Sequence, residues 1–252
     1  MRSEHGESLR NVEENITHYE ILQNPEVRTE LKERMSHLID QVRERHVDAL
    51  VFLDRSARPL SWLFREMWKK NFPDERVPDI KFLNIGSRSF VHSGAAKRLT
   101  SGYSKEPWHL EGDLMRKMQD FDFRNDWLNL SDVPDEWQSS VADNTDQLEE
   151  LKDVYKHSFD DKRVLIVDDF IFSGRSELVA IASLSAIFEK GSFFGTALFH
   201  STGEGIDIDR QKIPWLSIPG MSGVMELPES NLVSFKISQG GFDLIRQNLI
   251  QE

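Results

Sequence analysis

Two neighbouring aspartates stand directly after an apolar run in the segment 163–176, whose sequence is RVLIVDDFIFSGRS. The apolar residues 164–167 predict a buried strand, so Asp168 and Asp169 are expected at its carboxyl end. Adjacent carboxylates accept hydrogen bonds, and they therefore suit the hydroxyl groups of a sugar or a hydrated divalent cation. The segment predicts a polar ligand site at the end of a buried strand.

The residues after the aspartates offer complementary chemistry. Residues 170–176 connect the predicted strand to a helix, and the unpaired amides and dipole at a helix N-terminus favour an anion such as phosphate. Gly174 lets the backbone approach a ligand closely, and Ser173 and Ser176 add hydroxyl donors. Either serine could instead be only a helix cap. A ligand with a phosphate at one end and a diol near a metal at the other satisfies both halves of the segment.

The elements that must position these residues form an alternating pattern, which predicts an α/β fold with a mainly parallel sheet. The predicted strands are 48–54, 80–86, 163–169 and 192–200, with 232–238 as a candidate fifth. The predicted helices run from Pro25 to about residue 46, from Pro59 onward, from 176 to a stop at Gly191, and over 241–250. Because such sheets bind ligands beyond the carboxyl ends of their strands, polar residues after each run are candidate site residues.

The predicted organisation is an N-terminal helical extension, residues 1–47, followed by an α/β domain, residues 48–252. The helix within the extension favours packing or a role in a homodimer. Residues 87–160 show no regular pattern, and we expect an insertion over about 100–155. Much of the net charge of −12 falls there, since residues 111–153 contain 13 acidic and 4 basic side chains. We interpret this stretch as a solvated acidic segment.

Composition excludes several classes of function. The chain has 252 residues and no cysteine, which excludes disulfides, thiolate metal sites and a cysteine nucleophile. Its acidic net charge offers no basic footprint for nucleic acid. No apolar run approaches the roughly 20 residues that span a bilayer, and residues 1–20 lack the apolar core of a signal peptide. We therefore expect a cytoplasmic protein without a nucleic-acid or membrane partner.

The segment 164–176 resembles the ribose-5-phosphate loop of the type I phosphoribosyltransferases. The shared pattern is an apolar run, two acids, two apolar residues, a variable residue, Ser-Gly and a closing serine, and it covers 13 residues. A weaker resemblance extends over about 48–90 and 162–200. It implies the α/β fold of that family and 5-phosphoribosyl pyrophosphate (PRPP) as the ligand.

The resemblance also implies roles for individual residues. Asp168 and Asp169 would hold the ribose hydroxyls as the catalytic pair, with Mg bound to them indirectly, through water or the ligand. The residues of the 5-phosphate loop would be Phe172, Ser173, Gly174, Arg175 and Ser176. The pyrophosphate would lie against the loop after the first strand and a basic residue of the candidate hood segment 86–105: Arg55, Ser56, Ala57, Arg58 and Arg88.

The implied activity is transfer of the 5-phosphoribosyl group to an unidentified nitrogen acceptor, with release of pyrophosphate, in nucleotide metabolism. Purine-salvage members often carry an acid at the variable position, whereas this chain has Phe172. That departure and the acidic insertion leave an alternative, a non-catalytic protein that senses PRPP or a nucleotide. Two further interpretations are a receiver domain, for which too few residues follow Asp169, and strand-end acids that bind nothing.

Overall fold

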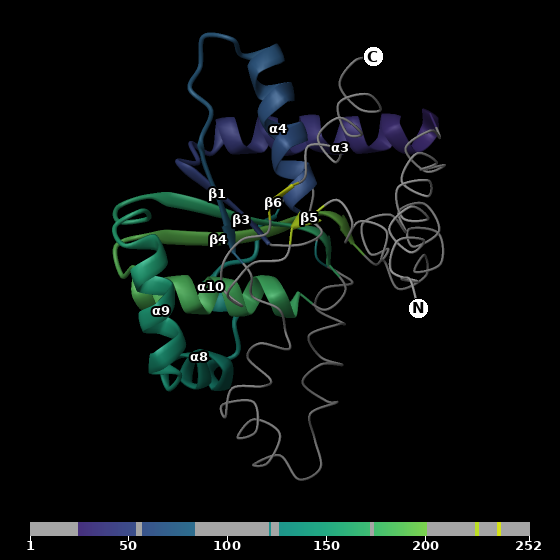
Figure 1. Ribbon diagram of the computed structural model, residues 1–252. Helices are drawn as coiled ribbons and strands as arrows, with labels where there is room; N and C mark the ends of the chain where they lie inside the picture. The colour runs from purple at the N-terminus through teal and green to yellow at the C-terminus, as the bar shows by residue number, and fades with distance from the viewer. Residues whose placement is uncertain are drawn as a thin grey trace, which may run out of the picture.

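The computed structural model describes residues 25–53, 57–83, 121, 126–171 and 174–200, together with the backbone of 225–226 and 236–237. Four strands in these ranges form one all-parallel sheet, in the order β2-β1-β3-β4 (Figure 1). Their bounds are Ala49–Leu53 for β1, Asp79–Leu83 for β2, Arg163–Ile171 for β3 and Ser192–His200 for β4. The predicted α/β class with a mainly parallel sheet is confirmed.

The central strands β1 and β3 are apolar over residues 49–53 and 164–167, and both faces of the sheet are covered there. Successive side chains of a strand point to opposite faces. In β1, Phe52 packs into the core on one face, and its neighbours Val51 and Leu53 pack into the core on the other. All five residues of β1 are buried.

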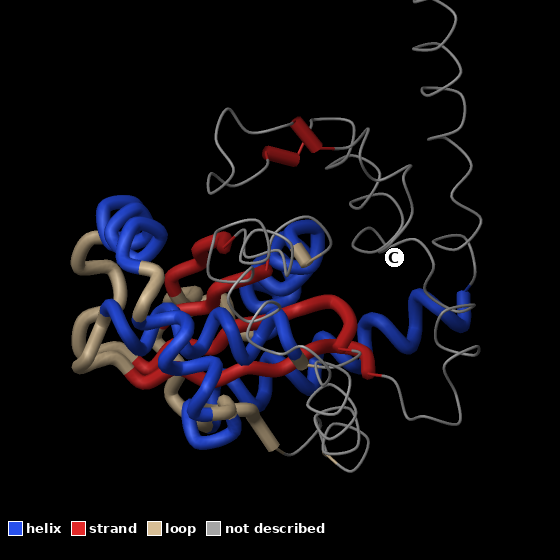
Figure 2. The backbone as a smooth tube through the Cα atoms, turned by 90° about the horizontal axis from the view of Figure 1, so that it is seen from below, coloured by secondary structure: helices blue, strands red, loops and turns tan. Residues whose placement is uncertain are grey.

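Helices form a layer on each side of the sheet (Figure 1). One layer holds α3, Pro25–Glu44, and α4, Arg58–Asn71. The other holds α8, Asp135–Ala142, α9, Thr145–Tyr155, and α10, Arg175–Ile187, which overlie the strands in Figure 2. The apolar stripe of α3 lies in the same core as the sheet, so this helix is an integral layer of the fold; its buried members are Leu31, Met35, Leu38, Ile39 and Val42.

A hydrogen-bonded cap ends α3 just before β1. The Val47 N–H donates to the Val42 carbonyl at 3.0 Å, and the His46 N–H donates to the Arg43 carbonyl at 3.2 Å. These two bonds form a Schellman motif, in which the residue after the C-cap adopts the left-handed conformation. His46 takes that position with φ 52°. The predicted helix from Pro25 is confirmed, and its last helical residue is Glu44.

The expectation of an irregular stretch over 87–160 is wrong for its described part. Residues 130–132 form a 3₁₀ turn, and α8 and α9 follow. Leu148, Leu151 and Tyr155 recur at helical spacing and pack toward the core, while the acidic side chains of α9 lie on its outer side. The many acidic residues obscured the amphipathic pattern that the spacing of these three apolar residues indicates.

Other boundaries also differ from expectation. β3 runs two residues past Asp169, to Ile171. α10 ends at Ile187 rather than near Gly191, because Phe188 leaves the helix and packs against Phe159, with ring centroids 5.4 Å apart.

The candidate fifth strand does not join the parallel sheet in the described residues. Residues 236–237 form β6, Lys236–Ile237, which pairs antiparallel with β5, Met225–Glu226, as a separate two-stranded sheet (Figure 2). Residues 1–24 of the predicted N-terminal extension and the helix expected over 241–250 lie outside the described residues.

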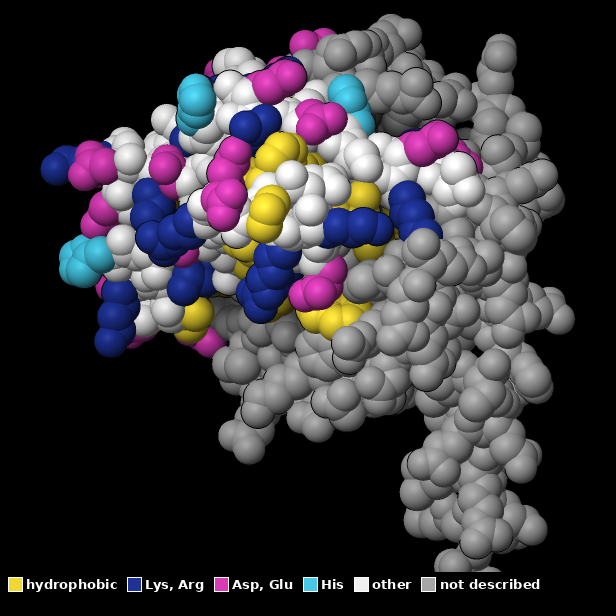
Figure 3. Space-filling model, turned by 90° about the horizontal axis from the view of Figure 1, so that it is seen from above, with side chains coloured by type: hydrophobic (Ala, Val, Ile, Leu, Met, Phe, Trp, Pro, Cys, Tyr) yellow, Lys and Arg dark blue, Asp and Glu magenta, His cyan; other side chains and the backbone are white. Residues whose placement is uncertain are grey.

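The surface over α3 and α4 carries both signs of charge. Lys and Arg side chains alternate there with Asp and Glu side chains, without a broad patch of either sign on the described part of this face (Figure 3). Among the described helices, none has the length and apolar character that crossing a membrane requires.

Candidate functional site

The strand order creates a switch point between β1 and β3. The chain leaves β1 toward β2 on one side, whereas β3 pairs with β1 on the other side. Ligands of open parallel sheets bind at such a point, beyond the carboxyl ends of the strands. The register places Phe52 of β1 opposite Val167 of β3, so the end of β1 lies beside Asp168. The acidic pair thus stands where this architecture forms its crevice.

The two aspartates are tightly held at the end of β3. The backbone N–H of Asp169 donates to Oδ1 of Asp168 at 2.8 Å. Asp169 is buried, with 6% of its surface exposed, and Asp168 is half-buried. Burial, and next the negative charge of Glu177, raise the pKa of Asp168 to about 7. A group that donates a hydrogen bond or carries positive charge would therefore be favoured beside Asp168.

Glu177 is a third carboxylate at this site, and the sequence analysis missed it. It lies in the first turn of α10, it is 2% exposed, and its Oε1 has no hydrogen-bond partner. Burial is the main cause that raises the pKa of Glu177 to about 7. Glu177 shares the buried stripe of α10 with Ile181 and Leu184, and an acid in an apolar stripe is the signal that could have revealed it.

A glycine in β4 allows Glu177 to lie so close to the sheet. A Cβ atom at Gly195 would come within 3.3 Å of the Glu177 Cβ and 3.1 Å of Ile181 Cδ1. Because β4 is an edge strand of the described sheet, the Gly195 backbone is free of a neighbouring strand on one side, where it exchanges two hydrogen bonds of 2.8 Å with Leu128. Gly195 therefore fixes both the approach of α10 and the path of the segment that leads into α8.

The loop after β3 ends at a glycine whose backbone is in the left-handed conformation, which residues other than glycine rarely adopt. Gly174 is the N-cap of α10 with φ 69°, and its carbonyl accepts from the Leu178 N–H at 2.9 Å. The alternative that Ser176 caps the helix is wrong, because Ser176 lies inside the first turn. The Arg175 guanidinium lies over the Trp137 ring of α8, 5.7 Å from its centroid. The acidic segment therefore contacts the predicted phosphate loop directly.

The same segment also reaches the end of β2. The Tyr155 hydroxyl of α9 donates to the Phe82 carbonyl. Together with the Leu128–Gly195 bridge, this contact ties the acidic segment to two strands of the sheet. The described part of the segment supports the site from the α10 face rather than projecting into solvent.

Several residues of the predicted site lie outside the described part of the chain. Ala57 is described, fully buried, and it is the N-cap of α4. Arg58 begins that helix, but its side chain is not described. The remaining predicted site residues outside the described ranges are Arg55, Ser56, Arg88, Phe172 and Ser173. The described ranges contain the acidic pair, Gly174, Arg175 and Ser176, and Asp168 interacts with Glu177 in the first turn of α10.

The acidic cluster does not itself form a metal-binding cage. Across the described residues, no three His, Asp or Glu side chains are arranged to hold a metal ion. That Mg would meet Asp168 and Asp169 through water or a ligand stays a prediction. No protein family, characterised protein or solved structure matched the chain in our comparisons. The fold and the site together define an α/β protein with an acidic cluster near the carboxyl end of β3, beside a helix N-terminus.

Proposed function

We propose that the crevice binds PRPP with Mg and transfers its 5-phosphoribosyl group to a nitrogen acceptor, releasing pyrophosphate. The observation that supports this most is the placement of Asp168 and Asp169 at the carboxyl end of β3, beside the switch point. Gly174, the N-cap of α10 a few residues later, adds a helix start that favours anions. The combination suits a ribose diol at one end and a phosphate at the other.

The roles in the transfer follow from the charge that develops as pyrophosphate leaves. The ribosyl carbon becomes cation-like, and nearby carboxylates that hold the ribose hydroxyls stabilise it. The amides at the start of α10 hold the 5-phosphate and fix the sugar against Asp168 and Asp169. Asp168 and Asp169 would hold Mg indirectly, through water or the ligand, and the ion would supply positive charge against the pyrophosphate. The basic residues Arg55, Arg58 and Arg88 would add donors on that side.

We expect hypoxanthine and guanine to be poor acceptors. In this proposal Phe172 lies beside the acceptor, and phenylalanine offers neither a hydrogen-bond acceptor nor a base for a purine ring N–H. The missing hydrogen bond would cost about 1–3 kcal/mol, which slows transfer about 5- to 150-fold. The measurement is steady-state pyrophosphate release with each common base, orotate and nicotinate, at saturating Mg and PRPP.

Efficient turnover of hypoxanthine or guanine would show that Phe172 does not act at the acceptor. Turnover of another nitrogen base would support the enzyme. PRPP binding without turnover of any acceptor would instead support the second candidate, a PRPP sensor.

Replacing both Arg55 and Arg58 with Ala should weaken PRPP much more than ribose 5-phosphate. Charge-assisted hydrogen bonds contribute about 1.5–3 kcal/mol each, so PRPP affinity should fall at least tenfold. Ribose 5-phosphate lacks the pyrophosphate and should lose little affinity. Competition binding of the two ligands to the wild-type and variant chains measures the difference. Equal losses for both ligands would place the arginines away from the pyrophosphate.

A further inference from the structure

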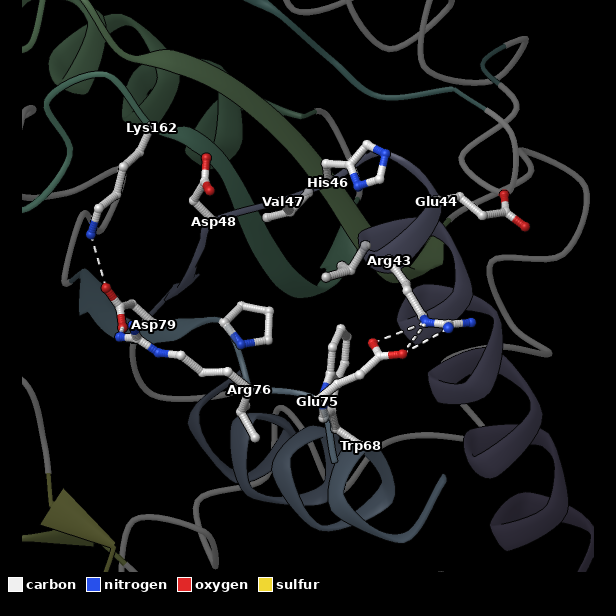
Figure 4. A pocket seen from close by; sticks show the side chains of 13 residues that line it. Arg43, Glu44, His46, Val47, Asp48, Trp68, Glu75, Arg76, Asp79 and Lys162 are labelled. Carbon is white, nitrogen blue, oxygen red and sulfur yellow. Dashed lines mark hydrogen bonds and ion pairs between the residues drawn. The ribbon is translucent and has the colours of Figure 1, made fainter. Parts of the chain in front are cut away.

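Acidic side chains at the two ends of the sheet have different surroundings. Around the amino ends of the strands, Arg43 holds Glu75 through three hydrogen bonds of 2.7–3.0 Å (Figure 4). In the same view Lys162 binds Asp79 at 2.8 Å. Glu177, next to the carboxyl end of β3, is 2% exposed instead, and its Oε1 has no hydrogen-bond partner. Burying a carboxyl group in this way costs stability, and local costs of this kind are typical of functional sites.

The alternation of β3 places the Asp168 side chain on the face of the sheet that α10 covers. Val164 and Ile166 of β3 belong to the same core as Ile181 of α10. Because successive side chains of a strand point to opposite faces, Asp168 lies on the same face as Ile166. Asp168 therefore points from the sheet toward α10.

Glu177 reaches the same face through the glycine of β4. Gly195 stands opposite Ile166 in the register, and a Cβ atom at Gly195 would come within 3.3 Å of the Glu177 Cβ. Asp168 stands opposite Ala197, two residues further along both strands. The side chains of Asp168 and Glu177 consequently meet between the sheet and α10, where they interact.

Asp168 is held from two sides and keeps an exposed part. Its Oδ1 accepts from the Asp169 N–H at 2.8 Å, and its carboxyl group meets Glu177. Asp168 is half-buried, whereas Glu177 is almost fully buried. A ligand can therefore touch Asp168 but not Glu177, so Glu177 can act on a ligand only through Asp168.

Building on the proposed PRPP function, we propose that Glu177 is a positioning residue, which orients the Asp168 carboxyl group toward the ribose hydroxyls. Burial favours the neutral form of Glu177, and a neutral carboxyl group can donate a hydrogen bond to Asp168. Together with the bond from the Asp169 N–H, this contact fixes the orientation of Asp168. The remaining lone pairs of Asp168 are then available to the diol.

Calorimetric titration of the full chain with PRPP and Mg tests this role. Glu177→Met keeps an unbranched side chain but removes the hydrogen bond, and it should weaken PRPP at least about tenfold. It should not lower stability to urea, because methionine suits the apolar stripe of α10. Glu177→Gln keeps a donor of the same shape and should bind PRPP within about threefold of wild type. A loss of affinity without a loss of stability, restored by Gln, separates positioning from a merely structural role.

A double-mutant cycle shows whether Glu177 acts through Asp168. Asp168→Asn alone should weaken PRPP, and adding Glu177→Met to it should cause at most about a threefold further loss. Ile181→Val is the matched control, because Ile181 also packs over Gly195, with its Cδ1 3.1 Å from where a Cβ would stand. It loosens the same contact and should leave PRPP affinity unchanged.

Wild-type affinity in Glu177→Met would overturn the positioning role, and so would additive losses in the cycle or equal losses in the Met and Gln variants. If Glu177→Met does not fold, Glu177→Leu takes its place with the same expectations. Each of these results leaves PRPP binding by the wild-type chain intact. Absence of that binding would instead refute the proposed function, and this inference with it.

Discussion

The Asp168→Asn, Asp169→Asn protein should fold and lose at least about a hundredfold in PRPP affinity. Each carboxylate would accept charge-assisted hydrogen bonds from the ribose, which contribute about 1.5–3 kcal/mol each. The fold should survive because burial already disfavours the charged form of Asp168, whose pKa is raised to about 7. An Asn at 168 also keeps an oxygen for the Asp169 N–H. Calorimetric titration with PRPP and Mg measures the loss.

The chain offers a matched control at the other end of the same strand. Asp160 and Asp161 are also adjacent aspartates, and they lie just before β3 begins. Asp161 has φ 55°, a conformation that Asn tolerates well. Replacing this pair with Asn makes the same two side-chain changes at the other end of the strand and should leave PRPP affinity unchanged. Unchanged affinity in the variant of Asp168 and Asp169 would refute the assignment of the site.

Glu177→Gln should make the folded protein more stable at pH 8 but not at pH 4. The native pKa of Glu177 is about 7 against an ordinary value of 4.5, so the native state retains a proton that the unfolded chain has released between these values. Stability therefore falls as pH rises through this window and stays low above it. The difference between the native and unfolded pKa values of Glu177 corresponds to a loss of about 3 kcal/mol of stability at most for an isolated group. Glutamine never ionises, so we expect a gain of about 1–3 kcal/mol at pH 8.

Urea unfolding of both proteins from pH 4 to pH 8 measures this effect. Glu189→Gln is the control, because Glu189 is exposed just after the end of α10 and its replacement should not change the pH profile. Parallel stability curves for wild type and Glu177→Gln would contradict a buried, proton-holding Glu177. The result is independent of PRPP, so it tests the geometry of the cluster separately from the proposed function.

The parallel sheet was predictable because its central strands carry continuous apolar runs that are buried on both faces. Runs such as 49–53 and 164–167 are continuously apolar, and this pattern is typical of buried strands in parallel sheets. The acids that end β3 were equally visible as a sharp change from apolar to charged residues. Their environment was not, since it depends on Glu177 and on the close approach at Gly195, which come from different elements. Contacts between elements distant in the chain leave little local trace in a sequence.

The acidic segment is a case in which the prediction from the sequence was wrong. Because of its charge, the sequence analysis interpreted this segment as solvated and irregular. In the structure, however, Val141, Leu151 and Tyr155 are buried in the core between the segment and the sheet. The contact between Arg175 and Trp137 could not be foreseen, because it joins the start of α10 to a helix that charge had concealed.

Binding of PRPP to the wild-type chain tests the central claim most directly. Calorimetric titration with PRPP in excess Mg should show saturable binding at one site per chain, and both ribose 5-phosphate and pyrophosphate should compete for it. This result is expected because the acidic pair and the start of α10 would hold the ribose phosphate, with the pyrophosphate on the adjacent loop. No saturable binding of PRPP with Mg would contradict the proposed function.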